Sequence, residues 1–365
     1  MNEMLLKEIT TAEVGGPAKT YIRASSEADI INALKDVQQR SDALLIIGGG
    51  SNILVSDEGF NGTVLHIVSE GIEILDADSN ETTVTVRVQA GHSWDGFVEH
   101  AVNEGWSGVE ALSGIPGTVG ATPVQNVGAY GSEVAHTITQ VRVWDRNTNE
   151  IITFSNEELH FSYRDSLLKQ HMSNGLSRYV VLSVVFTLEK RAESAPIRYA
   201  ELARQLGVNA GDRAELQDVR EKVLMLRASK GMVLNPQDRD TYSTGSFFTN
   251  PIIDNTQLKN LPQNAPQYPV YDVQGNLIDG KTKLSAAWLI EHAGFSKGFG
   301  LDREHNDICG ARASLSTKHT LAITNRGNAQ CQDILAIART VREGVTQKFG
   351  VHLVPEPVMV GITLD

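Results

Sequence analysis

A glycine-rich stretch, Glu110–Glu133, restricts most strongly what this chain can fold into. Its sequence, EALSGIPGTVGATPVQNVGAYGSE, contains two prolines and few charged side chains. Glycine has no Cβ, so its backbone can approach a ligand closely and adopt positive φ, and proline fixes the turns between such approaches. A core strand would be more β-branched. We therefore expect this backbone to wrap around a large bound group, to which three polar side chains can hydrogen-bond: Gln125, Asn126 and Tyr130.

A second stretch, Leu45–Asn52, has the sequence LIIGGGSN, in which an apolar run ends in three glycines and two small polar residues. Backbone N–H groups converge in such a loop and form a nest for an anion, to which the polar side chains can also donate. The loop lacks the lysine of a P-loop, and no GxGxxG opens a helix nearby. One alternative is a set of tight turns in a glycine-rich α/β protein. Two such loops in one chain favour a long phosphorylated cofactor that spans both.

The length and composition indicate a globular protein of several domains. At 365 residues the chain is too long for one ordinary hydrophobic core, so two or three domains are expected. No apolar run approaches the roughly 20 residues that a membrane helix needs. Residues 1–11 do not resemble a signal peptide. We therefore expect a soluble protein of the cytoplasm that does not bind membranes.

Charge, cysteines and histidines restrict the partners further. The net charge of -12 argues against nucleic acid and against an anionic membrane surface, so cationic contacts to a phosphorylated ligand must be local. Cys309 and Cys331 have no spacing typical of a zinc site and suit a reducing compartment as buried thiols. The ten histidines show no metal-ligand spacing, so no metal is expected.

Hydrophobic periodicity predicts an α/β segment followed by a mainly antiparallel α+β segment. A polar, proline-containing connection at 235–244, which we expect to be a domain boundary, then leads into the last third of the chain. The predicted strands are 20–23, 43–47, 82–90, 141–145, 151–154, 179–188 and 320–324, and the predicted helices are 25–39 (capped by Ser26), 94–103, 200–206, 214–227, 286–292 and 331–349.

Two polar side chains stand in unusual surroundings. Arg164 lies between Tyr163 and Asp165 beside apolar strands, and a buried arginine requires a carboxylate or phosphate partner. A solvated Arg164–Asp165 neighbour pair explains this segment equally well. Ser246 lies between Gly245 and two phenylalanines, with no histidine base nearby in sequence. This context suits a proton donor rather than a nucleophile, although a capping serine before an aromatic strand is the alternative.

Glu356 is a third candidate, because it stands between Pro355 and Pro357 in an apolar segment. The prolines hold its backbone extended. A buried glutamate is costly unless it is paired or protonated, which favours a functional role. The alternative is a charge that protects an edge strand from aggregation.

Together these motifs resemble the UDP-N-acetylenolpyruvoylglucosamine reductase family, over essentially the whole chain. The matching segments are GGGSN at 48–52, SGIPGTVGATPVQNVGAYGSE at 113–133, YRDS at 163–166, GSFFTNP at 245–251, SAAWLIEHAG at 285–294 and PEP at 355–357.

The resemblance implies an α+β protein: a two-subdomain FAD-binding fold of the vanillyl-alcohol-oxidase-like (PCMH-type) class, with a C-terminal α+β substrate domain. The implied boundaries are 1–75 for the first FAD-binding subdomain, 76–227 for the second, 228–350 for the substrate domain and 351–365 for a return strand carrying Glu356. Some relatives in the wider class attach flavin through a histidine after the triple glycine. Ser51 occupies that position here, so non-covalent FAD is expected.

The resemblance also assigns residues to roles. The catalytic residues would be Arg164, Ser246 and Glu356. Cofactor contacts would come from Gly48, Gly49, Gly50, Ser51, Asn52, His92, Ser113, Gly114, Ile115, Pro116, Gly117, Gly120, Ala121 and Val184. Substrate contacts would come from Gln125, Asn126, Tyr130, Tyr163, Tyr199 in the covering loop 197–202, Lys230 facing a phosphate, and Asn250. Ser316 stands where some members have a histidine, which leaves the contacts there undefined.

The implied activity is reduction of UDP-N-acetylenolpyruvoylglucosamine to UDP-N-acetylmuramate through FAD, with NADPH as hydride donor, in cytoplasmic peptidoglycan precursor synthesis. Arg164 would stabilise the enolate, with Glu356 completing the polar cluster, and Ser246 would protonate the α-carbon. A monomer is expected. Two other classes remain open: a related flavin oxidase acting on another alcohol or sugar, and a non-catalytic module that binds flavin or a sugar nucleotide.

Overall fold

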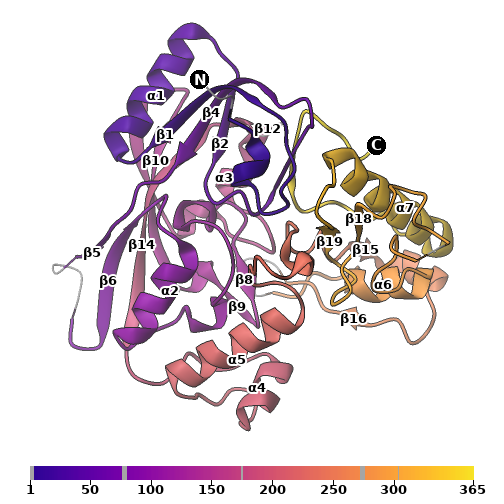
Figure 1. The fold of residues 1–365 in the computed structure, drawn as a ribbon. Coiled ribbons are helices and arrows are strands. Elements are labelled where there is room, and N and C mark those ends of the chain that lie inside the picture. Colours follow the sequence, from indigo (N-terminus) through magenta and orange to yellow (C-terminus); the bar gives the residue numbers. More distant parts are fainter. Residues whose placement is uncertain (1–3, 76–79, 174–175, 272–275, 303) are drawn as a thin grey trace. The chain divides into compact units, whose positions relative to one another are not determined.

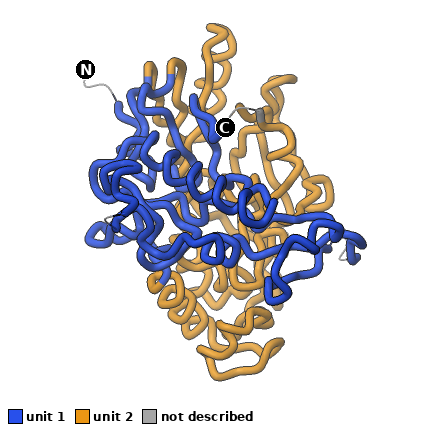
Figure 2. The backbone as a smooth tube through the Cα atoms, turned by 90° about the vertical axis from the view of Figure 1, so that its right-hand side faces the viewer, with its two compact units in different colours: residues 1–18, 50–60, 230–365 blue, residues 19–49, 61–229 orange. Residues whose placement is uncertain are grey.

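The computed structural model describes residues 4–75, 80–173, 176–271, 276–302 and 304–365, and Figure 1 shows their fold. The residues group into two compact units, which Figure 2 colours separately. Unit 1 combines residues 1–18, 50–60 and 230–365, and unit 2 combines residues 19–49 and 61–229. Each unit is thus built from segments that are separated along the chain. The domain boundaries given above stay a prediction.

The first sheet of unit 2 has the strand order β1-β4-β2, from Ala18–Ala24, Phe60–Ile67 and Leu44–Ile47. Strands β2 and β4 are parallel. Helix α1, Glu27–Arg40, lies between β1 and β2 in the chain and begins at Ser26, whose hydroxyl accepts the Asp29 N–H. Its buried face includes Ile30, Leu34 and Val37. The predicted β–α–β segment and its serine cap are confirmed.

The larger sheet of unit 2 has the order β11-β10-β14-β6-β5, and β7 also pairs with β14. Its neighbouring strands are all antiparallel, which confirms the prediction of a mainly antiparallel α+β segment. At its centre, β14 pairs on both sides through Val184, which lies opposite Val141 and Val88. The bounds are β5 Ile72–Ile74, β6 Thr83–Gln89, β7 Trp106–Ser107, β10 Ile138–Asp145, β11 Glu150–Ser155 and β14 Tyr179–Lys190.

Besides α1, the described residues of unit 2 form four α-helices: α2 Trp94–Asn103, α3 Leu167–Gln170, α4 Ala200–Leu206 and α5 Leu216–Ser229. Helices α2 and α4 have the predicted bounds, whereas α5 begins and ends two residues later than predicted. Side chains of α4 and α5 share a small core with Ile197, and Tyr130 packs against it. We call residues 197–229 the α4–α5 module. Two short hairpins pair β8 Gly128–Ala129 with β9 Ser132–Glu133, and β12 Met172–Ser173 with β13 Leu176–Ser177.

Unit 1 is organised around α7, Cys331–Phe349, which has the predicted bounds and a largely buried inner face. Helix α6, Ala286–Ala293, begins at the Ser285 cap and ends at Gly294 with φ 107°. Parallel pairing joins β3 to β20. The strand orders are β15-β17-β16, β18-β19 and β20-β3, with bounds β3 Ile53–Val55, β15 Ile252–Asp254, β16 Gln267–Tyr268, β17 Lys281–Leu284, β18 Ala313–Leu315, β19 Ile323–Asn325 and β20 Val358–Val360.

One predicted strand is misplaced, because β19 covers Ile323–Asn325 instead of 320–324. The residues just before it form a turn, in which the Ser316 hydroxyl accepts the N–H groups of Lys318 and His319. Such side-chain hydrogen bonds compete with strand pairing and delay the start of the strand.

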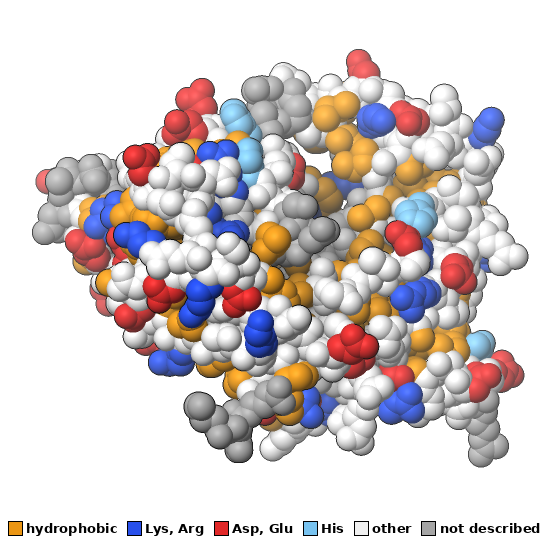
Figure 3. Space-filling view, turned by 90° about the horizontal axis from the view of Figure 1, so that it is seen from above, with side chains coloured by type: hydrophobic (Ala, Val, Ile, Leu, Met, Phe, Trp, Pro, Cys, Tyr) orange, Lys and Arg blue, Asp and Glu red, His pale blue; other side chains and the backbone are white. Residues whose placement is uncertain are grey.

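Both cysteines are free and buried, as predicted. Burial raises the pKa of the Cys331 thiol to about 12. No helix within the described ranges is long and apolar enough to span a membrane. On the face shown in Figure 3, acidic and basic side chains are interspersed in spite of the net charge of -12. Local cationic contacts are therefore compatible with an acidic chain.

Candidate active site

Gly48 and Gly49, the part of the first glycine loop that belongs to unit 2, directly touch the second glycine loop of that unit. A Cβ on Gly49 would lie 2.7 Å from the Gly117 Cα, and a Cβ on Gly48 would lie 2.3 Å from the Thr118 hydroxyl oxygen. Real Cβ contacts are never that short, so only glycine allows this approach. The first loop follows β2 and the second follows the 3₁₀ helix Glu110–Leu112. The structure therefore brings together the two stretches that the sequence singled out.

The second loop, Ser113–Ala121, is anchored on the N-terminal end of α2. The Gly117 carbonyl accepts the Trp94 N–H at 3.1 Å. The Gly120 N–H donates to the Ala90 carbonyl at 2.8 Å, and a Cβ on Gly120 would meet the Ala90 side chain at 2.6 Å. A carboxylate oxygen of Asp95 accepts the Gly114 N–H at 2.6 Å. These contacts fix the backbone of the loop at several points along its length.

Buried polar atoms near these loops fit a bound cofactor. The His92 Nδ1 and the Ser183 hydroxyl are buried, and neither has a hydrogen-bond partner among the described residues. His92 lies beside the second loop, since its carbonyl accepts the Val119 N–H, and Ser183 precedes Val184 on β14. Burial also lowers the pKa of His92. Buried polar groups normally have partners, so donors and acceptors of a ligand explain these two atoms. The glycine contacts and these atoms together fit FAD.

Arg164 lies in a tight turn with a left-handed backbone, φ 55°. The turn is closed by backbone hydrogen bonds between Ser162 and Asp165 in both directions. The guanidinium Nη2 donates to the Gly128 carbonyl at 3.0 Å, and the Arg164 carbonyl accepts from Lys169 Nζ at 2.7 Å. The Asp165 carboxylate accepts from a different residue, Gln170. Arg164 is thus directed towards β8, which lies in the glycine-rich stretch Glu110–Glu133.

Two of the predicted polar side chains lie at the β8–β9 hairpin beside Arg164: Tyr130 in its turn, and Asn126 two residues before β8. Asn126 is buried, and its amide donates to Glu133 at 2.7 Å and to the Ser162 carbonyl at 3.1 Å. Tyr130 has a left-handed backbone, φ 51°. Burial raises the pKa of Tyr130 to about 12. The hairpin and the Arg164 turn are therefore one connected polar structure.

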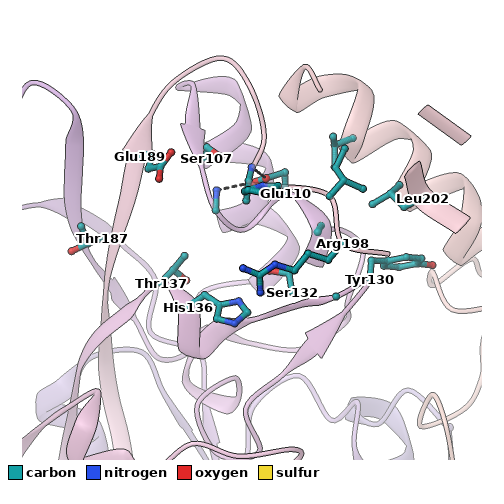
Figure 4. A pocket seen from close by; sticks show the side chains of 17 residues that line it. Ser107, Glu110, Tyr130, Ser132, His136, Thr137, Thr187, Glu189, Arg198 and Leu202 are labelled. Atoms are coloured by element: carbon teal, nitrogen blue, oxygen red, sulfur yellow. Dashed lines mark hydrogen bonds between the residues drawn. The ribbon is translucent and has the colours of Figure 1, made fainter. Parts of the chain in front are cut away.

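Tyr199 of the α4–α5 module meets the same hairpin. Its ring stands edge-on to the Tyr130 ring, with centroids 5.4 Å apart and an interplanar angle of 88°. Tyr199 is 40% exposed, so much of the ring is available to a ligand. A pocket of about 220 Å³ is lined by Tyr130 and by Arg198, the residue before Tyr199, and Figure 4 shows both with Ser132 and Glu110 around it.

In unit 1, the segments carrying Ser246 and Glu356 are direct neighbours. The Glu356 N–H donates to the Phe247 carbonyl at 2.8 Å, and Phe248 bridges to Pro355. The Phe247 and Phe248 side chains are buried, and their rings lie 5.0 Å apart. Gly245, with φ 76°, turns the chain immediately before Ser246. The segments that carry Ser246 and Glu356 are far apart in sequence but hydrogen-bonded to each other, next to two buried aromatic rings.

The remaining predicted contacts of unit 1 lie on different elements. The Asn250 side-chain oxygen accepts the Ala286 N–H at 2.9 Å, at the start of α6. Lys230 interacts electrostatically with His319. Burial lowers the pKa of His319 to about 4, and Lys230 and Lys297 act in the same direction while Glu291 opposes them. His319 is therefore a neutral imidazole beside two lysines.

Sequence reasoning did not single out several polar residues at these sites. His319 stands three residues after the Ser316 that was noted, and only its lysine neighbours in space mark it. Asp95 holds Gly114 and receives two hydrogen bonds from Arg220, at 2.7 and 3.0 Å. Burial acts to raise the pKa of Asp95, but the Arg220 and Gly114 hydrogen bonds hold it below its usual value. Glu110 is the third such residue. No sequence pattern connects these side chains with their partners.

Comparison with known protein families identifies the class first. Residues 18–155, which include both glycine loops, match the family described as "FAD binding domain". Residues 236–360 match the C-terminal domain family of UDP-N-acetylenolpyruvoylglucosamine reductase. The chain is therefore a flavoprotein, an FAD-containing oxidoreductase with a C-terminal domain of its own.

Similarity to curated proteins then defines the family. The chain is 49% identical to the UDP-N-acetylenolpyruvoylglucosamine reductase of Thermobifida fusca over 362 residues, which cover 98% of this chain and 97% of that protein. It is 46% identical to the enzyme of the same name from Streptomyces coelicolor, with coverage of 100% and 91%. The chain belongs to the UDP-N-acetylenolpyruvoylglucosamine reductase family.

A solved structure supports the fold. The chain matches the crystal structure of UDP-N-acetylenolpyruvylglucosamine reductase from Thermus caldophilus with a TM-score of 0.63 and 24% identity, covering 98% of each chain. Together with the two family matches, this confirms the predicted two-subdomain FAD-binding fold followed by a C-terminal domain.

Proposed function

We propose that this chain reduces UDP-N-acetylenolpyruvoylglucosamine to UDP-N-acetylmuramate, with NADPH as the hydride donor. The observation that carries the proposal is the sequence identity of 49%, over 98% of the chain, with a reductase named for that substrate. When bound, FAD supplies the hydride chemistry, while the chain's own residues bind, orient and protonate the substrate. We further propose that the FAD is non-covalent and that the protein acts as a cytoplasmic monomer in peptidoglycan precursor synthesis.

Arg164 would stabilise negative charge on the substrate carboxylate. Reduction of an enol ether next to a carboxylate places an enolate charge on that carboxylate, and a fixed guanidinium can hold it with two parallel hydrogen bonds. The Gly128 hydrogen bond and the closed turn support this role, because they orient the side chain before substrate binds.

Ser246 would donate the proton to the α-carbon, with Glu356 completing the polar cluster. The proximity of the two segments supports this pairing, since the Glu356 N–H donates to the carbonyl of the residue after Ser246. The buried phenylalanines next to Ser246 limit the conformations of its backbone. A proton donor must be held within hydrogen-bond reach of its target, which such a rigid support favours.

The remaining residues would bind ligands. Lys230, beside the neutral His319, would contact a phosphate of the sugar nucleotide, and Asn250 would contact the substrate from the start of α6. Tyr199 would cover the substrate, supported by the edge contact with Tyr130. Gln125, Asn126, Tyr130 and Tyr163 would line the same region. The FAD contacts would be Gly48, Gly49, Gly50, Ser51, Asn52, His92, Ser113, Gly114, Ile115, Pro116, Gly117, Gly120, Ala121 and Val184.

The visible spectrum of the purified protein tests this proposal. We expect flavin absorbance that acid precipitation releases into the supernatant as FAD. Under anaerobic conditions NADPH should bleach it, and UDP-N-acetylenolpyruvoylglucosamine should restore it with formation of UDP-N-acetylmuramate. Reoxidation by oxygen but not by the enolpyruvyl sugar would instead assign the chain to the flavin oxidases. Flavin that NADPH does not bleach would favour a binding module.

A further inference from the structure

Glu110 is a buried carboxylate that the proposed chemistry does not use. Its residue is 1% exposed, and each carboxylate oxygen accepts one backbone N–H: Oε2 from Gly108 and Oε1 from Ala195, both at 2.6 Å (Figure 4). Burying a carboxylate is costly unless such hydrogen bonds compensate, and hydrogen bonds to a charged acceptor are the stronger kind. The Ala195 bond joins two segments that are far apart in sequence.

On one side, Glu110 belongs to the backbone that forms the second glycine loop. It begins the 3₁₀ helix Glu110–Leu112, which runs directly into Ser113 and Gly114. The Ser113 hydroxyl donates to the Glu110 carbonyl at 2.7 Å. The fixed backbone of the cofactor loop therefore holds Glu110 in place.

On the other side, Ala195 begins the short segment 195–199 that ends at Tyr199. This segment lines the pocket of about 220 Å³ that Figure 4 shows. The space on the pocket side of the segment is therefore not filled by packed side chains. Its approach to the hairpin is close, because a Cβ on Gly131 would lie 3.1 Å from the Arg198 Cβ. Only a small shift of the segment would change the contact between the Tyr130 and Tyr199 rings.

We propose that Glu110 is a positioning residue that holds the segment 195–199 against the cofactor loop and thereby sets the place of Tyr199 over the substrate. This inference rests on the proposed function, which gives Tyr199 its role as a substrate cover. The rigid, hydrogen-bonded carboxylate reduces the number of conformations that the segment must lose when substrate binds. The effect of Glu110 is thus on substrate affinity, through Tyr199.

Glu110→Gln tests the proposal. The amide keeps the length of the side chain but offers only one acceptor oxygen, so an NH₂ group faces one of the two N–H donors. We expect the KM for UDP-N-acetylenolpyruvoylglucosamine to rise about tenfold or more, which corresponds to roughly 1.4 kcal/mol. The kcat should stay within about twofold, and the affinity of the apoprotein for FAD, measured by flavin fluorescence quenching, should not change.

Tyr199→Ala and the double variant separate the inference from the proposed function. Tyr199→Ala alone should raise the KM, and Glu110→Gln should add nothing further in that background, since it acts through Tyr199. An unchanged KM in Tyr199→Ala would overturn the role of Tyr199 itself. A raised KM in Tyr199→Ala with an unchanged KM in Glu110→Gln, or fully additive effects, would overturn the role of Glu110 alone.

Asp95→Asn is the matched control, because Asp95 is a second carboxylate that holds the cofactor loop, through Gly114, but bonds to Arg220 instead of the 195–199 segment. It should weaken FAD binding without the selective rise in KM. If Glu110→Gln does not fold, Ala195→Pro removes the donor N–H and leaves Glu110 intact, with the same expected KM. Failure of both variants to fold would assign Glu110 a structural role and refute the proposal.

Discussion

At the scale of single residues, Arg164 combines a strained backbone with a directed side chain. A left-handed conformation costs a non-glycine residue on the order of 1 kcal/mol or more. The two backbone hydrogen bonds of the turn and the Gly128 contact hold it there. Such strain is retained where the position of a side chain matters, which favours the catalytic interpretation of Arg164 over a solvated neighbour pair.

Replacing Arg164 by lysine should abolish most activity while leaving the fold intact. Lysine keeps the charge but loses the planar fork that can bind a carboxylate with two hydrogen bonds. We expect kcat with the enolpyruvyl sugar to fall by about 10² or more, with the flavin spectrum and the melting temperature little changed. Steady-state kinetics and thermal unfolding measure both. Near wild-type turnover in Arg164→Lys would make Arg164 an ordinary surface residue.

Ser246→Ala should separate the two half-reactions. A proton donor is needed only when the substrate is reduced, so flavin reduction by NADPH should proceed normally. Reoxidation by the sugar nucleotide should slow by about 10²–10⁴-fold, as is typical for a lost general acid. Ser246→Cys should recover part of that loss, because a thiol can still donate. Stopped-flow absorbance of the flavin follows each step, and equal slowing of both would mean that Ser246 shapes the flavin site.

At the scale of elements, Gly49→Ala should force the two glycine loops apart. The new Cβ would lie 2.7 Å from the Gly117 Cα, which is backbone and cannot rotate away. We expect FAD affinity to fall at least tenfold and the melting temperature to drop. Gly96→Ala is the control: its nearest neighbour is the Ser93 Cβ at 3.3 Å, and alanine favours a helix. Equal FAD affinity in the two variants would show that the contact between the loops does not shape the cofactor site.

The elements that could be predicted from the sequence are those with local causes. Helices 94–103 and 331–349 have the predicted bounds because apolar periodicity marks their buried faces. The strand at 320–324 was wrong because the side chain of Ser316 stabilises a turn that periodicity does not reveal. At the candidate site, the motifs identified the glycine loops. They could not place Glu356 beside Phe247, or Glu110 beside Ala195, because tertiary hydrogen bonds bring these residues together.

At the scale of the whole molecule, His319 should make stability depend on pH. Its pKa is about 4 in the folded protein and about 6.5 without the burial that lowers it. As the pH falls below 6.5, the unfolded chain binds this proton before the folded protein does. The stability that neutral His319 contributes is therefore complete above pH 6.5 and is lost progressively between pH 6.5 and about pH 4. His319→Gln should flatten this part of the profile of unfolding free energy, measured with urea between pH 4 and 7.

The exposed His352 of the same unit provides the control for that measurement. His352→Gln should keep the wild-type pH dependence, because it removes an exposed imidazole and leaves the buried surroundings of His319 unchanged. A profile in His319→Gln that falls as steeply as the wild type between pH 6.5 and 4 would assign the loss of stability to carboxylates instead.

The pairing of β3 with β20 has a consequence for biosynthesis. Ile53 leaves the ribosome early, whereas its partner Val358 is added only after α7 is complete. Residues 61–229, by contrast, form one uninterrupted stretch of unit 2. Closing a long loop between remote strands is slow compared with local folding. We therefore expect a nascent chain to form the loop Ser113–Ala121 while Ser246 and Glu356 are still to be translated, so that part of the cofactor site is in place before the residues that turn over substrate are made.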